Sequence, residues 1–161
     1  MLDKIKKMKM LILDVDGTMT DGGVYIMEDG MQFKKFHARD GMGIKLAIKA
    51  GTDVGIISHS LVSEMVTSRA NTLGMKYYYV GTKPKEEILD GWQKELDLKD
   101  EEIAFIGDDV NDYEIMQRVG FCACPADAAT QIKAIADVIL EKKGGDGAVR
   151  EFIDRFILKV D

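Results

Sequence analysis

Short apolar runs alternate with amphipathic segments along this chain, and this alternation constrains the fold more than any other feature. The runs occupy residues 8–13, 54–58, 77–80 and 103–106, with shorter candidates at 121–124 and 138–140. The segments between them predict helices at about 40–50, 61–73, 84–96, 109–119, 130–136 and 148–158. Apolar strands joined by helices form parallel sheets that are covered on both faces. The sequence therefore predicts a three-layer, doubly wound α/β fold with a mainly parallel sheet.

A β-hairpin at about residues 23–37 is the one predicted element that interrupts this alternation. Asp29-Gly30 lies there between two stretches of β character, and Asp-Gly in that setting is a strong hairpin signal. Four apolar residues on this hairpin have no evident place in the main sheet, which suggests a subunit interface: Val24, Ile26, Met31 and Phe33. Packing on their own domain is the alternative.

The spacing of the predicted elements leaves no room for a second domain over the sheet. Residues 19–57 hold only the hairpin and one helix, and residues 59–82 hold only one helix and one strand. We therefore expect a single domain over residues 1–161, a length that one hydrophobic core can serve.

Charge and hydropathy exclude several classes of partner. The 161 residues include 22 Lys and Arg against 28 Asp and Glu, giving a formal net charge of −6. Nucleic acids and anionic membranes attract the opposite charge, so neither is expected as a partner. No apolar run approaches the ~20 residues that cross a bilayer, and the N-terminal residues lack a signal-peptide pattern. We expect a cytoplasmic protein, in which Cys122 and Cys124 are buried, inert thiols rather than a metal or redox pair.

Polar residues follow each of the first four apolar runs. In open α/β sheets, ligands bind beyond the carboxyl ends of the strands, so these side chains should converge there. In chain order they are Asp14 and Asp16, Ser58, Lys83 and Lys85, and Asp108, Asp109 and Asp112. Five carboxylates in one place raise one another's pKa unless a cation joins them, and a hard divalent ion such as Mg²⁺ suits oxygen ligands.

Such a cluster suits phosphoryl transfer. A metal ion and a lysine neutralise the phosphate oxygens, a hydroxyl donates to another oxygen, and one aspartate attacks phosphorus. A second carboxylate can protonate the leaving alkoxide and later activate water. In an extended chain, the Asp-x-Asp spacing of Asp14 and Asp16 puts both side chains on one side, as these two roles require.

Together these residues resemble the four motifs of the haloacid dehalogenase (HAD) superfamily of phosphohydrolases. The matching segments are Asp-Val-Asp-Gly-Thr at 14–18, Ser58, Lys85, and Gly-Asp-Asp-x-x-Asp at 107–112. The resemblance implies that Asp14 is the nucleophile and Asp16 the general acid and base. It assigns phosphate binding to Thr18 and Ser58, and stabilisation of the phosphorylated intermediate to Lys85, with Lys83 as the alternative lysine. It also implies that Mg²⁺ is held by Asp14, the backbone carbonyl of Asp16 and Asp108, supported by Asp109 and Asp112.

Three further segments resemble one capless branch of that superfamily. They are residues 20–25 (TDGGVY), 35–44 (KFHARDGMGI) and 144–151 (GGDGAVRE). This branch contains the 3-deoxy-D-manno-octulosonate (KDO) 8-phosphate phosphatases and relatives acting on 9-phosphates of sialic-acid or KDN-type sugars. The resemblance implies a cytoplasmic homotetramer, with the hairpins forming a central barrel and each subunit helping to close a neighbour's active site. It places Arg150 near an adjacent site and lets Arg69 face the carboxylate of the sugar.

One loop departs from that pattern, which leaves the substrate open. The octulosonate enzymes usually have Gly-Arg after the second strand and a sialic-type relative has Gly-Glu, whereas this chain has Ser58-His59-Ser60-Leu61. His59 is either a substrate contact or a solvated residue at a helix start. The expected substrate is KDO 8-phosphate, with a nine-carbon sugar acid 9-phosphate as the alternative.

Two readings from other classes remain. A phosphorylatable receiver module has a similar set of residues, but its paired acids follow the first strand and its single acceptor aspartate follows the third. In this chain Asp-x-Asp follows the first strand and the adjacent pair, Asp108 and Asp109, follows the fourth. A non-catalytic tetramerisation domain, related to those beside acylneuraminate cytidylyltransferases, would tolerate loss of the carboxylates. Both Asp14 and Asp16 are present, which favours an enzyme.

Overall fold

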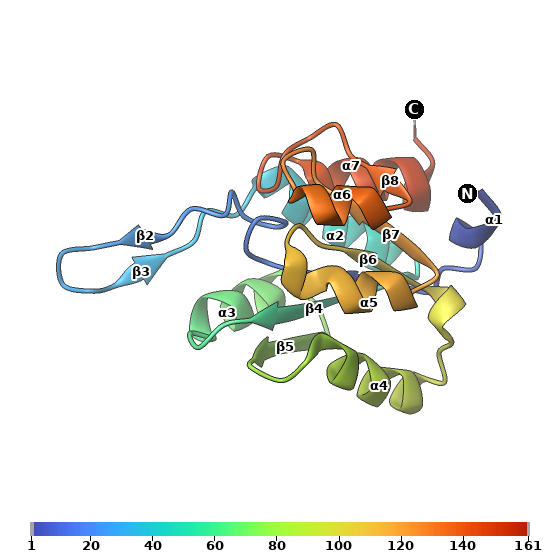
Figure 1. The fold of residues 1–161 in the computed structure, drawn as a ribbon, viewed down its shortest axis with the longest axis horizontal. Coiled ribbons are helices and arrows are strands. Elements are labelled where there is room, and N and C mark those ends of the chain that lie inside the picture. The colour runs from blue at the N-terminus through green and yellow to red at the C-terminus, as the bar shows by residue number, and fades with distance from the viewer. Residues whose placement is uncertain (1, 161) are drawn as a thin grey trace.

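A six-stranded parallel sheet forms the centre of the computed structural model, which describes residues 2–160 (Figure 1). Its strands are β1 (Met10–Leu13), β4 (Asp53–His59), β5 (Tyr77–Gly81), β6 (Ile103–Ile106), β7 (Phe121–Cys124) and β8 (Val138–Ile139). Their order across the sheet is β5-β4-β1-β6-β7-β8, and every neighbouring pair is parallel. The chain thus winds outward in both directions from β1, and the predicted doubly wound fold is confirmed.

Helices cover both faces of this sheet (Figure 1). They are α1 (Leu2–Ile5), α2 (Ala38–Lys49), α3 (Glu64–Leu73), α4 (Lys85–Leu96), α5 (Tyr113–Arg118), α6 (Thr130–Ile135) and α7 (Ala148–Phe152). Two 3₁₀ turns, η1 (Asp100–Glu102) and η2 (Val110–Asp112), and a π-helical turn, η3 (Ile153–Leu158), complete the elements.

Alternation along the buried strands divides the core into two clusters. In β1, Leu11 and Leu13 face the cluster formed with α2, α3 and α7, whereas Met10 and Ile12 face the cluster formed with α4, α5 and α6. Strands buried on both faces read as continuous apolar runs, which is why these segments were recognisable in the sequence. Cys122 and Cys124 point into the second cluster as free, buried thiols, as expected.

Some predicted helix boundaries are wrong, for identifiable reasons. Asp40 does not cap α2 but lies within its first turn, where its Oδ1 accepts the backbone N–H of Arg150 at 2.8 Å. The helix expected from residue 61 begins only at Glu64, because the Ser60 hydroxyl closes a local turn with the backbone of Val62. The helix expected at 148–158 changes to π-helical geometry at Ile153.

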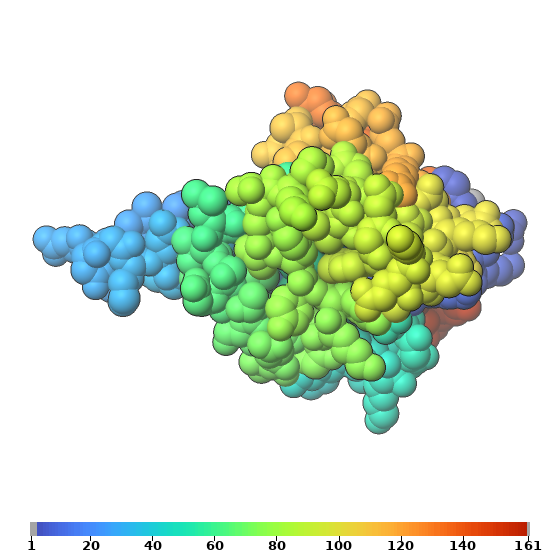
Figure 2. Space-filling model, turned by 90° about the horizontal axis from the view of Figure 1, so that it is seen from below, coloured from blue at the N-terminus to red at the C-terminus, as the bar shows by residue number. Residues whose placement is uncertain are grey.

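The predicted hairpin projects from the body of the molecule (Figures 1 and 2). Its strands are β2 (Tyr25–Ile26) and β3 (Gln32–Phe33), which pair antiparallel, and a bridge between Thr20 and Phe36 closes its base. The four apolar residues noted in the sequence are exposed rather than packed on the body: Val24, Ile26, Met31 and Phe33.

No cap domain lies over the carboxyl ends of the strands in the part of the chain that the structure describes. Only the hairpin and α2 separate β1 from β4, and only α3 separates β4 from β5. Within residues 2–160, no helix combines the length and the apolar character needed to span a membrane.

Candidate active site

The loop after β1 is a tight turn that carries two of the motif aspartates. The N–H of Asp14 donates to the carbonyl of Ile106 at 3.0 Å, so the ladder between β1 and β6 continues into the motif. The backbone N–H groups of Thr18, Met19 and Thr20 all point at the carbonyl of Val15, at 2.9–3.1 Å. Gly17 makes this turn possible, because its φ is +84° and a Cβ there would lie 2.0 Å from Oδ2 of Asp108.

A fully buried lysine joins two carboxylates at the centre of the site. Lys85 is the first residue of α4, and its Nζ lies 2.5 Å from Oδ1 of Asp14 and 2.5 Å from Oδ1 of Asp112. Its side chain is 1% exposed. Lys83, the alternative motif lysine, is at the surface, with its Nζ 3.4 Å from Oε1 of Glu87. The structure therefore brings Lys85, and not Lys83, to the aspartates.

The loop after β6 orients the remaining aspartates. Oδ2 of Asp112 accepts the backbone N–H of Asp108 at 2.9 Å and, more weakly, that of Asp109 at 3.4 Å. Asp109 points away to cap η2, where its Oδ1 accepts the N–H of Val110 at 2.7 Å. Both oxygens of Asp112 are thus engaged within the protein, by Lys85 and by this loop, whereas the carboxylate of Asp108 accepts a long hydrogen bond from Thr18 Oγ1 at 3.3 Å.

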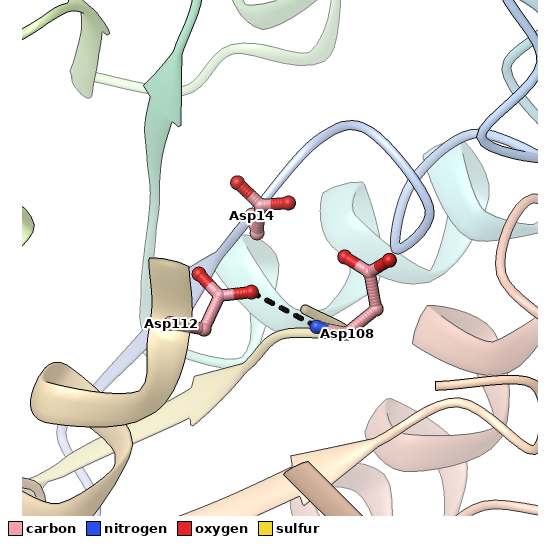
Figure 3. A group of neighbouring side chains, drawn as sticks. All are labelled: Asp14, Asp108 and Asp112. Atoms are coloured by element: carbon pink, nitrogen blue, oxygen red, sulfur yellow. Dashed lines mark hydrogen bonds between the residues drawn. The ribbon is translucent and has the colours of Figure 1, made fainter. Parts of the chain in front are cut away.

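The carboxylates of Asp14, Asp108 and Asp112 each offer an oxygen within 4.8 Å of the others (Figure 3). Burial, together with the Asp112 carboxylate, raises the pKa of Asp14 to about 7, although Lys85 opposes this shift. Burial and the two neighbouring carboxylates likewise raise the pKa of Asp108 to about 8. Both shifts reflect the cost of burying carboxylates close to one another, and a bound divalent cation would offset that cost. Asp14 and Asp108 have oxygens left for such an ion, so the donor set fits Mg²⁺.

Two buried hydroxyls complete the predicted phosphate-binding set. Thr18 is buried between the loops after β1 and β6. Ser58, in β4, is 1% exposed, and its Oγ has no hydrogen-bond partner within residues 2–160. A buried polar atom without a partner is uncommon in folded proteins and calls for an explanation. A ligand oxygen at the end of β4 would provide one.

Asp16 stands apart from the buried group. Its side chain is 45% exposed, and its Oδ1 lies 2.5 Å from Nζ of Lys34, at the base of the hairpin. Lys34 was not singled out in the sequence. The available signal was its position: the return strand of a hairpin inserted directly after the motif must bring its residues back beside the motif.

The remaining predicted substrate residues make their contacts elsewhere. A ring nitrogen of His59, Nε2, lies 2.6 Å from the carbonyl oxygen of Lys83. The guanidinium of Arg69 lies over the ring of Phe36, 5.5 Å from its centroid. Nε of Arg150 donates to the Asp154 carboxylate at 2.8 Å, beside a pocket of about 470 Å³. In the described part of the chain, none of the three is hydrogen-bonded to Asp14, Asp108 or Asp112.

The glycine-rich segment 144–147 packs against the loop after β1. The N–H of Gly145 donates to the carbonyl of Thr18 at 3.1 Å, and the N–H of Gly144 donates to Oδ1 of Asp127 at 3.0 Å. A Cβ at position 144 would lie 1.7 Å from the carbonyl oxygen of Gly17. This close approach explains the glycine at 144 and ties the C-terminal motif to the catalytic loop.

Sequence comparisons place the chain among known hydrolases. Residues 62–153 match the haloacid dehalogenase-like hydrolase family. The 3-deoxy-D-manno-octulosonate 8-phosphate phosphatase of Yersinia pestis is 36% identical over 160 residues, which are 99% of this chain and 85% of that protein. The phosphatase of the same name from Escherichia coli K12 is 36% identical over 155 residues, 96% of this chain and 82% of that protein.

Solved structures agree with this placement. The Moraxella catarrhalis phosphatase of that name, in complex with magnesium, phosphate and KDO, matches with a TM-score of 0.93 and 33% identity over 98% of this chain and 90% of its own. The cobalt-bound Haemophilus influenzae enzyme matches with a TM-score of 0.90 and 34% identity, over 97% and 91% of the two chains. Because such relatives span nearly its full length, the chain belongs to the haloacid dehalogenase-like hydrolases and is a phosphoric monoester hydrolase within that family.

Proposed function

We propose that this protein is a Mg²⁺-dependent phosphatase that hydrolyses 3-deoxy-D-manno-octulosonate 8-phosphate through a phosphorylated Asp14. The observation that carries the proposal is that the buried side chains of Asp14, Lys85 and Asp112 and the half-buried carboxylate of Asp108 come together at the carboxyl ends of β1 and β6. The names of the relatives supply the substrate. Release of this sugar acid also assigns the protein to lipopolysaccharide synthesis.

Asp14 is placed to attack phosphorus. The ion pair between Lys85 and Oδ1 of Asp14 holds the carboxylate in place for attack on phosphorus. Lys85 also supplies positive charge for the aspartyl phosphate that results. The hydroxyl of Ser58 donates to a phosphate oxygen, and the hydroxyl of Thr18, which faces Asp108 in this structure, turns to donate to another. A bound Mg²⁺, held by Asp14, Asp108 and the backbone carbonyl of Asp16, would add positive charge for the same oxygens.

Asp16 transfers the proton in both steps of this mechanism, the phosphorylation of Asp14 and the hydrolysis of the aspartyl phosphate. It donates a proton to the sugar oxygen as the bond from phosphorus to that oxygen breaks. The resulting carboxylate then accepts a proton from water, whose oxygen attacks phosphorus and releases Asp14 and inorganic phosphate. Its partial exposure suits this role, because Asp16 must reach both the leaving group and water.

The end of β4 and the loop that follows it leave one alternative substrate class open. Its sequence, Ser58-His59-Ser60-Leu61, differs from the octulosonate pattern, and His59 and Leu61 line an open pocket of about 280 Å³ beside it. The second candidate is therefore a 9-phosphate of a sialic-acid or KDN-type sugar.

A homotetramer is part of the proposal. The exposed apolar side chains of the hairpin support self-association, and an uncapped site needs a neighbour to exclude water. Ile26→Glu with Phe33→Glu should reduce the mass measured by light scattering, whereas Val160→Glu, at another exposed apolar position, should not. A wild-type protein that is active and strictly monomeric would contradict the tetramer. A cytoplasmic location accompanies the proposal, because the two free thiols suit a reducing compartment.

The experiment that tests the function is a phosphate-release screen over eight- and nine-carbon sugar acid phosphates. Purified protein with Mg²⁺ should have its highest kcat/KM on KDO 8-phosphate, and chelation of the metal should abolish release. A preference for a 9-phosphate would select the alternative substrate. Absence of release from every sugar acid phosphate and every generic phosphate ester would instead favour a non-catalytic assembly domain.

A further inference from the structure

One ion pair connects the projecting hairpin to the catalytic loop. Lys34 directly follows β3, and its Nζ lies 2.5 Å from Oδ1 of Asp16. The side chain of Lys34 is only 14% exposed, although it belongs to the base of an exposed hairpin. The next residue, Lys35, is 63% exposed, and its Nζ lies 4.0 Å from Asp21. The two adjacent lysines therefore differ sharply in their surroundings.

The base of the hairpin holds Lys34 in place. The Thr20–Phe36 bridge joins the outgoing and returning strands just beside the catalytic loop. The carboxylate of Asp21 accepts the N–H of Gly23 at 3.0 Å and the hydroxyl of Tyr25. The ring of Tyr25 stacks on that of Phe33, with 4.7 Å between centroids. Lys34 thus directly follows Phe33, whose half-exposed ring is held by stacking on Tyr25.

The two aspartates of the motif each pair with a different lysine. Asp14 is bound by Lys85 in the interior, whereas the Asp16 carboxylate has no hydrogen-bond partner except Lys34 in the described part of the chain. Only Oδ1 of Asp16 is engaged, so Oδ2 is available to carry and transfer a proton. Among residues 2–160, no other polar contact fixes the direction of this carboxylate.

We propose that Lys34 is a positioning residue for the hydrolysis: its ammonium group orients the Asp16 carboxylate toward the leaving oxygen. The inference rests on the proposed function, in which Asp16 transfers the protons. It also makes the hairpin part of the active site, because the residue that orients Asp16 lies directly after the hairpin's returning strand. Lys34 itself forms no bond to the reacting atoms in this role.

The dependence of the rate on the leaving group distinguishes a positioning role of Lys34 from a merely structural one. An alkyl phosphate, such as a sugar phosphate or glycerol phosphate, needs its leaving oxygen protonated, whereas p-nitrophenyl phosphate has a stable leaving anion and needs little protonation. Lys34→Ala should lower kcat/KM on the alkyl phosphate by roughly 10- to 100-fold, the range expected when a catalytic group is misplaced by about 1 Å. The loss of kcat/KM on p-nitrophenyl phosphate should be several-fold smaller, because this ratio reports the first half of the reaction and not the hydrolysis of the aspartyl phosphate that both substrates share.

Three companion variants separate this role from others. Lys34→Arg keeps a cation beside Asp16 and should recover most of the loss, and Lys35→Ala should retain wild-type kinetics on both substrates. In an Asp16→Asn background, Lys34→Ala should cause no further loss on the alkyl phosphate, because the group that it orients is gone. Thermal denaturation of each variant checks that it is folded.

Other results would overturn the inference. An equal loss of kcat/KM on both substrates would show a structural role, and a rise in KM with kcat unchanged would show a role in substrate binding. Additive losses in the double variant would show that Lys34 acts independently of Asp16. The proposed substrate can be wrong while this inference holds. If wild-type protein hydrolyses glycerol phosphate and p-nitrophenyl phosphate but no sugar acid phosphate, the substrate proposal fails, and the role of Lys34 is still tested by comparing these two substrates.

Discussion

Replacement of Gly144 by alanine probes the link between the C-terminal motif and the catalytic loop. The new Cβ would lie 1.7 Å from the carbonyl oxygen of Gly17, 2.5 Å from its carbonyl carbon and 3.1 Å from the carbonyl oxygen of Thr20. All three are backbone atoms of the loop that carries Asp16 and Thr18. Gly144 does not lie in the left-handed region, so the penalty is one of packing and not of backbone conformation.

The structure sets the size of the effect. Real Cβ atoms essentially never approach closer than 3.0 Å, so the two loops must separate by at least 1.3 Å at this point. Overpacking of this kind costs about 1–3 kcal/mol of unfolding free energy. A displacement of about 1 Å in a group near the reacting atoms lowers kcat by roughly 100-fold. We therefore expect Gly144→Ala to be folded, less stable and strongly impaired.

Chemical denaturation and phosphate release from one substrate measure the two effects. Gly91→Ala is the matched control, because a Cβ in that part of α4 meets no atom within 4 Å, and alanine favours a helix by about 0.5–1 kcal/mol over glycine. Gly91→Ala should be at least as stable as wild type and fully active. Wild-type stability and kcat in Gly144→Ala would refute the claim that this segment supports the catalytic loop.

Three further predictions follow from the same contacts. Lys85→Met leaves Asp14 and Asp112 buried without their cation, so chemical denaturation without metal should show a loss of about 3–5 kcal/mol of unfolding free energy. Lys83→Met, at the surface, should lose little, and equal losses in the two variants would contradict the buried ion pairs. Mg²⁺ at 100 times its Kd should raise the unfolding free energy by about 2.7 kcal/mol, and Asp108→Asn should abolish this gain, whereas Glu28→Gln, on the exposed hairpin, should retain it. An unchanged gain in Asp108→Asn would place the ion elsewhere. Burial raises the pKa of Cys122 and of Cys124 to about 11, so both thiols stay protonated at pH 8 and should react with a thiol reagent only after unfolding; rapid labelling of folded protein would contradict their burial.

The sequence predicted the fold and the central site because both depend on local patterns. Continuous apolar runs identified the parallel strands, and strand ends necessarily meet at one edge, so Asp14, Asp108 and Lys85 could be grouped before any coordinates. The spacing between strands also excluded a cap domain.

Contacts between distant segments could not be predicted in this way. Asp40 follows the sequence pattern of a helix cap, but its partner is a backbone N–H 110 residues away, at Arg150. The close approach of Gly144 to Gly17 depends on how two loops fold in space. The hairpin indicates that its returning strand lies near the motif, but not that Lys34, rather than Lys35, pairs with Asp16. Helix starts were also misplaced where a side chain such as Ser60 forms a local turn.

Phosphate release from KDO 8-phosphate by wild-type protein and by Asp14→Asn, with Mg²⁺ present, tests the central claim most directly. Asn at this position is similar in size but cannot form the acyl phosphate, so the variant should be folded and inactive while wild type turns over. Release by Asp14→Asn at a rate comparable to that of wild type would contradict the assignment of Asp14 as the nucleophile.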